Sequence, residues 1–271
     1  MTQRRRPAGS GAPTPRIERY GRRTRWFHAG IYVVVLVLLG TGWWLLAGQE
    51  GNPSPLSRLF GTPDTSLHKV AGWVLVALVD LGVLAGARGV VSFVADSVRF
   101  RRSDGRWFTR WPAAVFTGRF AAHDGHFDPG QRILNIALTA GLAALIGSGV
   151  GMVLLHGGPV YAALFVVHRW ATYVVTVLII GHVGIAAGIL PGYRGVWRSM
   201  HLGGKLDRRV AARLWPGWAA RQGQCAMTRV LGVFVLGALD PVERAEVERH
   251  IDTCVSCAAE AADLARTARM L

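Results

Sequence analysis

The stretch FVVHRWATYVVTVLIIGHVGIAAGIL, residues 165–190, decides the fold because it is long and apolar yet contains two histidines, His168 and His182. It exceeds the roughly 20 residues that an α-helix needs to cross a bilayer. Fourteen residues advance a helix by about 21 Å and return to within about 40° of the starting direction. The two imidazoles therefore share one helix face near opposite ends of a membrane span. This spacing predicts two stacked cofactors.

Three further apolar runs accompany this one. The four runs cover about residues 26–48, 67–95, 131–155 and 162–190, and the second contains Asp80 and Arg88. Each run is long enough for a membrane helix, so the sequence predicts an all-α membrane protein with four transmembrane helices. The first 25 residues are basic and have no apolar core of their own. We therefore do not expect a cleaved signal peptide.

The net charge of +15 lies between the apolar runs rather than along one amphipathic surface. Arg and Lys concentrate before the first run, between the second and third, and after the fourth, whereas the other two connections contain only Arg58. The positive-inside rule then predicts a multi-pass membrane protein with both termini in the cytoplasm. The Arg-rich, Lys-poor composition suggests a bacterium, so the expected location is the bacterial plasma membrane. We interpret the basic residues as determinants of membrane topology that also contact anionic lipid. Nucleic-acid binding is the weaker alternative.

Four histidines lie in or at the ends of the runs at matching depths. His28 begins the first run from the cytoplasmic side, and His68 begins the second from the outside. The expected pairs are His28 with His182 at the inner level and His68 with His168 at the outer level. Low-spin haem b takes two axial imidazoles from facing helices, so the sequence predicts a four-helix bundle that holds two haem b groups. His156 is an alternative outer ligand, although LLHGGP is typical of a helix end.

The chain resembles the cytochrome b (gamma) subunit of respiratory formate dehydrogenases, within the bacterial di-haem cytochromes b. The resemblance covers about residues 16–220 and depends on the four histidines and on two segments, GHFDPGQRILN (125–135) and GKLDRRVAARLWPGW (204–218). It implies an electron-transfer subunit whose quinone pocket lies beside the inner haem, where this chain offers Asp128 and Gln131. The family commonly has Asn in place of Asp128.

The resemblance also implies partners. Electrons from a molybdenum- or tungsten-containing catalytic subunit would pass through an iron–sulfur subunit to the outer haem, then to the inner haem, and then to menaquinone or ubiquinone. The chain itself would carry no substrate chemistry beyond quinone redox. A cytochrome b subunit of a hydrogenase or of another oxidoreductase is an alternative that the sequence leaves open.

The C-terminal segment departs from that family. All three cysteines of the chain follow the last span, in the expected reducing cytoplasm, where a metal site is favoured over a disulfide. His250, Cys254 and Cys257 are expected on neighbouring turns of one helix face, with Cys225 upstream as a fourth ligand. This order resembles the zinc-binding domain of anti-sigma factors, which makes a sigma factor a candidate partner. Four such ligands predict a closed, structural zinc site.

The sequence therefore predicts four regions. They are a disordered basic arm (1–20), a four-helix transmembrane cytochrome b domain (21–200), a linker with a short amphipathic helix (201–221) and a small cytoplasmic zinc-binding helical domain (222–271). The predicted function is electron relay between a formate dehydrogenase-like partner and the quinone pool. A membrane-bound, redox-sensing anti-sigma factor is the regulatory alternative.

Overall fold

The computed structural model describes residues 16–49, 51–222 and 227–269. The chain divides into two compact units, Met1–Pro216 and Gly217–Leu271, and each is described here by itself. Residues 1–15 of the expected disordered arm, and Cys225 of the expected zinc site, lie outside the described residues. Residues 16–18 of that arm form a short strand.

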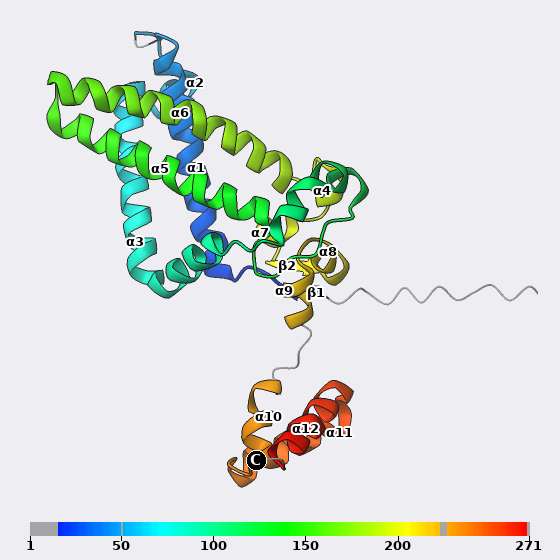
Figure 1. The fold of residues 1–271 in the computed structure, drawn as a ribbon. Helices are drawn as coiled ribbons and strands as arrows, with labels where there is room; N and C mark the ends of the chain where they lie inside the picture. Colours follow the sequence, from blue (N-terminus) through cyan, green and yellow to red (C-terminus); the bar gives the residue numbers. More distant parts are fainter. Residues whose placement is uncertain (1–15, 50, 223–226, 270–271) are drawn as a thin grey trace, which may run out of the picture. The chain divides into compact units, whose positions relative to one another are not determined.

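Four long helices make up most of the first unit (Figure 1). They are α1 (Arg22–Leu46), α3 (Asp64–Val98), α5 (Pro129–Leu155) and α6 (Gly158–Ala186). All four are long and apolar enough to cross a membrane, which confirms the predicted number of spans. Only 6–11% of an apolar 18-residue window in each helix is buried within the protein, which fits helices whose surface is covered by lipid. Helix α3 is interrupted at Gly86, where the backbone leaves helical geometry.

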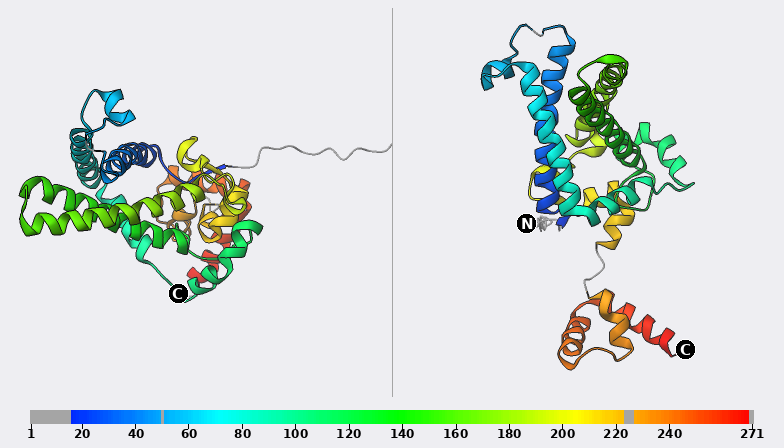
Figure 2. Two further views of the ribbon diagram at one scale, coloured as in Figure 1. Left: turned by 90° about the horizontal axis from the view of Figure 1, so that it is seen from above. Right: turned by 90° about the vertical axis from the view of Figure 1, so that its left-hand side faces the viewer.

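The long helices pack as two hairpins, α1 with α3 and α5 with α6 (Figures 1 and 2). Glycine allows the second hairpin to close tightly, since a Cβ at Gly141 of α5 would lie 2.5 Å from the Cγ2 atom of Val175. Val175 of α6 is fully buried. Helix α3 also packs against α5 and so joins the two hairpins.

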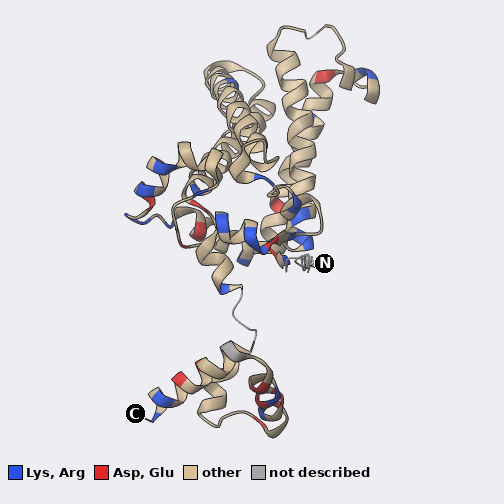
Figure 3. Ribbon diagram, turned by 90° about the vertical axis from the view of Figure 1, so that its right-hand side faces the viewer, with Lys and Arg blue, Asp and Glu red and all other residues tan. Residues whose placement is uncertain are grey.

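Short elements gather at one end of the four helices (Figure 1). They are β1 (Arg16–Glu18), α4 (Asp104–Thr117), the 3-10 helix η1 (Pro191–Tyr193), α7 (Arg198–His201), β2 (Lys205–Asp207) and α8 (Arg208–Leu214). Helix α2 (Pro55–Phe60) lies at the other end. Most Lys and Arg residues of the first unit also lie at the end with the short elements (Figure 3). This segregation is the pattern that the charge distribution of the sequence predicts.

The N-terminal strand is anchored by the tail of the first unit. β1 pairs antiparallel with β2, with Ile17 opposite Leu206, and Leu206 is almost fully buried. The backbone N–H of Arg19 donates to the carbonyl oxygen of Gly204 at 2.9 Å. The segment 201–221, expected as a linker with one short helix, thus supplies a strand and two short helices.

The second unit begins within the short helix α9 (Pro216–Arg221). Its other described residues form three helices, α10 (Thr228–Val235), α11 (Pro241–Thr253) and α12 (Val255–Ala268). Its core contains four buried residues, Leu231, Val247, Cys257 and Ala261. Helix α11 begins after a capping residue, because the Asp240 carboxylate accepts hydrogen bonds from two backbone N–H groups of the first turn. Pro241 at the first helical position supports the same start.

Candidate functional site

The structure brings together the two histidine pairs expected from the sequence. The ring centres of His28 and His182 lie 6.2 Å apart, and those of His68 and His168 are also 6.2 Å apart. His28 comes from α1, His68 from α3, and the other two from α6. Each pair therefore joins the two helical hairpins.

This spacing fits a metal-centred cofactor between the rings. With a metal–nitrogen bond of about 2 Å and about 1 Å from that nitrogen to the ring centre, two imidazoles on opposite sides of one iron have centres roughly 6 Å apart. Both observed separations meet this requirement. The residues present thus fit two bis-histidine haems.

His68 has a hydrogen-bond partner that selects its tautomer. The Thr41 hydroxyl lies 2.8 Å from the Nδ1 atom of His68 and 2.8 Å from the carbonyl oxygen of Val37. A hydroxyl has one proton, and the carbonyl can only accept. The Thr41 oxygen therefore donates to Val37 and accepts from His68 Nδ1–H, which leaves the Nε2 lone pair of His68 available to a metal.

His168 has the same arrangement on the other hairpin. The Ser148 hydroxyl donates to the carbonyl oxygen of Ala144 at 2.6 Å and lies 2.9 Å from the Nδ1 atom of His168. A glycine follows each hydroxyl: Cβ atoms at Gly42 and Gly149 would lie 3.2 and 3.3 Å from the Cε1 atoms of His68 and His168. The sequence analysis did not single out Thr41 or Ser148, because hydroxyls in apolar helices are common.

The His28–His182 pair has different surroundings. Within the described residues, the buried Nδ1 atom of His28 has no hydrogen-bond partner. The ring centre of Tyr32 lies 5.7 Å from that of His28 and 5.9 Å from that of His201. His201, which the sequence analysis also did not single out, comes from α7 and is exposed.

His156 lies at a helix end. It follows α5 as the C-terminal cap, with a left-handed φ of 52°, and its Nδ1 atom is 3.0 Å from the carbonyl oxygen of Leu154. Its ring is exposed. This arrangement fits the helix-end interpretation of LLHGGP rather than the alternative of an axial ligand.

The expected quinone residues lie at the start of α5. The Asp128 carboxylate caps this helix by accepting the backbone N–H of Gln131 at 2.8 Å. Asp128 is buried, and desolvation raises the pKa of its carboxyl group above the ordinary value. The side-chain Nε2 atom of Gln131 lies 3.5 Å from the Tyr20 hydroxyl, whereas its buried Oε1 atom has no hydrogen-bond partner within the described residues.

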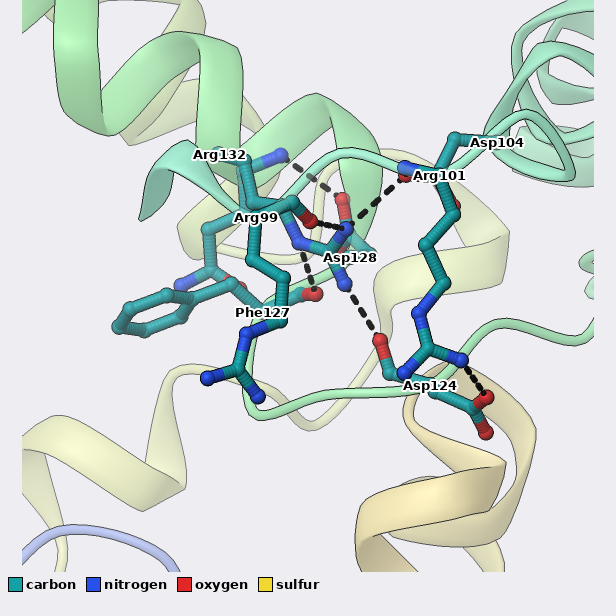
Figure 4. A network of polar contacts seen from close by, with 8 residues as sticks. Arg99, Arg101, Asp104, Asp124, Phe127, Asp128 and Arg132 are labelled. Carbon is teal, nitrogen blue, oxygen red and sulfur yellow. Dashed lines mark hydrogen bonds and ion pairs between the residues drawn. The ribbon is translucent and has the colours of Figure 1, made fainter. Parts of the chain in front are cut away.

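A buried arginine joins the loops around this cap (Figure 4). The Arg132 side chain pairs with the Asp104 carboxylate at 3.0 Å, and both side chains are almost completely buried. Its other N–H groups donate to the carbonyl oxygens of Arg99, Asp124 and Phe127. Arg132 thereby joins the end of α3, the start of α4 and the loop before α5.

A second buried cation, Arg19, contacts the loop before α5. The Arg19 guanidinium stacks 3.5 Å from the ring centre of Trp215 and donates to the carbonyl oxygen of His126 at 2.6 Å. Burial lowers the pKa of Arg19, and its charge in turn favours the ionised form of Asp128. The Asp128 carboxyl is therefore both desolvated and close to cations.

In the second unit, three expected zinc ligands come together. One ligand atom each from His250, Cys254 and Cys257 lies within 4.8 Å of the others. The prediction that they share one helix face is wrong. Cys254 has extended backbone geometry, with φ −115° and ψ 99°, and separates α11 from α12. The break brings ligands from two helices to one point.

One residue of the ligand cluster belongs to the core of the second unit, and a second, Cys254, packs against that core. Cys257 is fully buried beside Leu231 and Val247, and the Thr228 hydroxyl lies 3.9 Å from its Sγ atom. Two thiolates and an imidazole are the donors that zinc prefers in structural sites. The described residues thus supply three of the four ligands that a tetrahedral site requires.

Sequence comparison assigns families to both units. The model of the family described as "Prokaryotic cytochrome b561" matches residues 19–203, which include all four paired histidines. The model of the family described as "Putative zinc-finger" matches residues 227–258, which include His250, Cys254 and Cys257. No curated protein matches the chain.

Proposed function

The chain belongs to the prokaryotic cytochrome b561 family of membrane electron-transfer proteins, and on this basis we propose that it relays electrons between a dehydrogenase and the quinone pool through two b-type haems. The observation that carries the proposal is the pair of matched imidazole separations, 6.2 Å at each level. A bound haem supplies a one-electron carrier, and the protein holds it between two helices.

The His28–His182 and His68–His168 pairs are the proposed ligands. The 14-residue separation of His168 and His182 along α6 corresponds to about 21 Å of helix. Two carriers at these levels extend over much of a hydrocarbon core that is roughly 30 Å thick. We take the end with most of the Arg and Lys residues as cytoplasmic, which puts His28–His182 at the inner level.

The proposed quinone site lies at the start of α5, beside the inner pair. Gln131 offers a buried carbonyl oxygen, and burial of Asp128 favours the protonated carboxyl group that could give a proton to a reduced quinone. The proposed electron donor is an iron–sulfur subunit that serves a molybdenum or tungsten dehydrogenase of the formate dehydrogenase type. A hydrogenase or another oxidoreductase is the alternative donor.

The zinc-finger match favours a second function for the C-terminal unit. We propose that Cys225 completes the site with His250, Cys254 and Cys257 and that the zinc-bound unit binds a sigma factor. Cys257 belongs to the core of this unit and Cys254 packs against that core, so metal binding and partner binding are expected to be lost together.

Haem content tests the principal proposal. Purified protein should contain two low-spin b haems per chain with two redox midpoints. His168→Ala should remove one haem and His182→Ala the other, whereas His156→Ala, at a helix end, should remove neither. A single haem in fully loaded parent protein, or two unchanged signals in either ligand variant, would contradict the ligand assignment.

Quinone reduction tests the proposed site independently. Gln131→Ala should slow oxidation of the His28–His182 haem by quinone without changing haem content. Asp128→Asn preserves the helix cap but removes the carboxyl group that would give a proton to the reduced quinone. It should therefore slow the same step at pH values where the parent carboxyl is protonated. Rates equal to the parent in both variants would exclude this loop as the quinone site.

Sigma-factor binding is tested with the full chain. The parent protein, reconstituted in nanodiscs with zinc, should retain sigma factors of its own bacterium, and His250→Ala should not. If neither protein retains a sigma factor although the parent contains zinc, the regulatory role is contradicted. The electron-transfer proposal is not tested by this result.

A further inference from the structure

We propose that the hydroxyl groups of Thr41 and Ser148 are positioning groups for the His68–His168 haem: they hold both axial imidazoles in one tautomer and lower the reduction potential of that haem. The inference rests on the haem assignment of the proposed function. It deepens that assignment by naming the residues that make the two haems chemically different.

The direction of each hydrogen bond follows from the helix geometry. The Thr41 hydroxyl lies within reach of two carbonyl oxygens of its own helix, at Val37 (2.8 Å) and Leu38 (3.3 Å). The Ser148 hydroxyl lies at matching distances from Ala144 (2.6 Å) and Leu145 (3.3 Å). In each case the single hydroxyl proton is used within the helix, and a lone pair of the oxygen faces the imidazole.

The two arrangements are equivalent. In each hairpin the first helix supplies a hydroxyl followed by glycine, Thr41–Gly42 in α1 and Ser148–Gly149 in α5, and the second helix supplies the histidine. Each glycine leaves room for the ring, since a Cβ there would lie within 3.3 Å of the imidazole Cε1 atom. The matching contacts place an acceptor behind both axial ligands of one haem.

An acceptor behind Nδ1–H changes the ligand electronically. It draws the Nδ1 proton away from the ring and makes Nε2 a stronger donor to the metal. A stronger donor stabilises ferric iron over ferrous iron, so the reduction potential falls. The His28–His182 pair provides an internal reference, because within the described residues the Nδ1 atom of His28 has no hydrogen-bond partner.

The test removes each hydroxyl without changing the ligands. The variants are Thr41→Val, Ser148→Ala and the double variant, and the measurements are redox titration and electron paramagnetic resonance of the oxidised haems. We expect each single substitution to raise the potential of the His68–His168 haem, with a loss of up to about tenfold in the ferric preference, which is about 59 mV for a one-electron couple. The double variant should shift further, and the other midpoint should stay in place.

A matched control separates this effect from packing. Thr172 is a buried threonine of α6 whose hydroxyl donates to the backbone carbonyl oxygen of His168 at 2.9 Å. Thr172→Val therefore removes a neighbouring hydroxyl but leaves the Nδ1 contacts intact, and it should shift neither midpoint. Thr41→Ser keeps the acceptor and should retain the parent potential.

The outcomes separate this inference from the proposed function. His168→Ala first identifies which midpoint belongs to the His68–His168 haem. If that midpoint and its resonance spectrum are the same in the parent and the double variant, the hydroxyls do not tune the haem, although the haem assignment stands. If His168→Ala removes no haem signal, the proposed function itself is wrong. A shift of both midpoints by equal amounts would indicate a general structural effect and overturn the inference.

Discussion

Two helices of this protein begin with the same dipeptide in different surroundings. Asp128–Pro129 begins α5 in the first unit, and Asp240–Pro241 begins α11 in the second. Both carboxylates cap their helix through backbone N–H groups. Burial nevertheless raises the pKa of Asp128, whereas hydrogen bonds from the backbone of Glu243 and Val242 lower the pKa of the exposed Asp240. The sequence motif determines the local geometry, and the surroundings determine the chemistry.

The same contrast holds for the ion pairs of the two units. Arg132 and Asp104 of the first unit have side chains that are 2% and 6% exposed, whereas Arg244 and Glu248 of the second are 51% and 53% exposed. In the second unit, the buried reactive group is a metal ligand, since Cys257 belongs to the core. The stability of the first unit should therefore depend on internal polar contacts, and the stability of the second unit on its metal.

Removal of zinc should give the largest difference between the units. Structural zinc contributes an apparent binding free energy of about 10–16 kcal/mol in zinc-finger peptides. A strong chelator added to the full chain should therefore unfold residues 227–268 and leave the haem spectrum unchanged. Hydrogen exchange resolved by segment measures both effects in one sample. Equal protection of α10, α11 and α12 before and after metal removal would contradict the proposed structural zinc.

Disruption of the buried ion pair should give the next largest effect. Arg132→Met leaves the Asp104 carboxylate buried and unpaired, which costs about 3–5 kcal/mol. The matched change in the second unit, Arg244→Met, breaks an exposed pair worth about 0–1 kcal/mol. Chemical denaturation in detergent, followed at the haem for the first variant and by far-UV circular dichroism for the second, checks the contrast. Similar costs for the two variants would remove the distinction between the units.

The sequence alone was enough to predict the membrane helices and the histidine pairing. Hydropathy is a local property, so the four apolar runs predicted the four long helices to within a few residues at most ends. The 14-residue spacing of His168 and His182 required only helix geometry. The pairing of His28 with His182 and of His68 with His168 followed from the membrane depth of His28 and His68, which begin the first two apolar runs from opposite sides of the membrane.

The remaining features depend on contacts between distant segments. Thr41 contacts His68 only because α1 and α3 are rotated about their axes so that these two side chains face each other. Hydropathy does not specify that rotation. Arg132 is one of many arginines in the sequence, and only the fold brings Asp104 to it. The break at Cys254 was missed because the residues before and after it both have helical patterns.

The buried cap should tolerate loss of its charge. Asp128→Asn keeps a capping oxygen and removes the cost of desolvating a carboxylate, whereas Asp128→Ala loses the cap and costs about 1 kcal/mol. Because the folded-state pKa is raised, the native state binds the proton more tightly than the unfolded state. The stability of the parent relative to the Asn variant should thus fall as the pH rises from the pKa of Asp128 in the unfolded state toward its pKa in the folded state. Thermal unfolding at several pH values measures this difference, and a rise with pH would contradict it.

The exposed cap should give the smallest effect and the opposite order of variants. The lowered pKa of Asp240 means that its stabilising charge is present above the unfolded-state pKa and is lost as the pH falls through the folded value, so all of it is present at pH 7. The carboxylate also interacts favourably with the N-terminus of α11, a contribution that Asn lacks. Protection of the Val242 and Glu243 amides against hydrogen exchange at pH 7 should therefore decrease from the parent to Asp240→Asn and again to Asp240→Ala. Asn equal to or better than Asp at this position, as expected at Asp128, would show that exposure does not decide how the two caps behave.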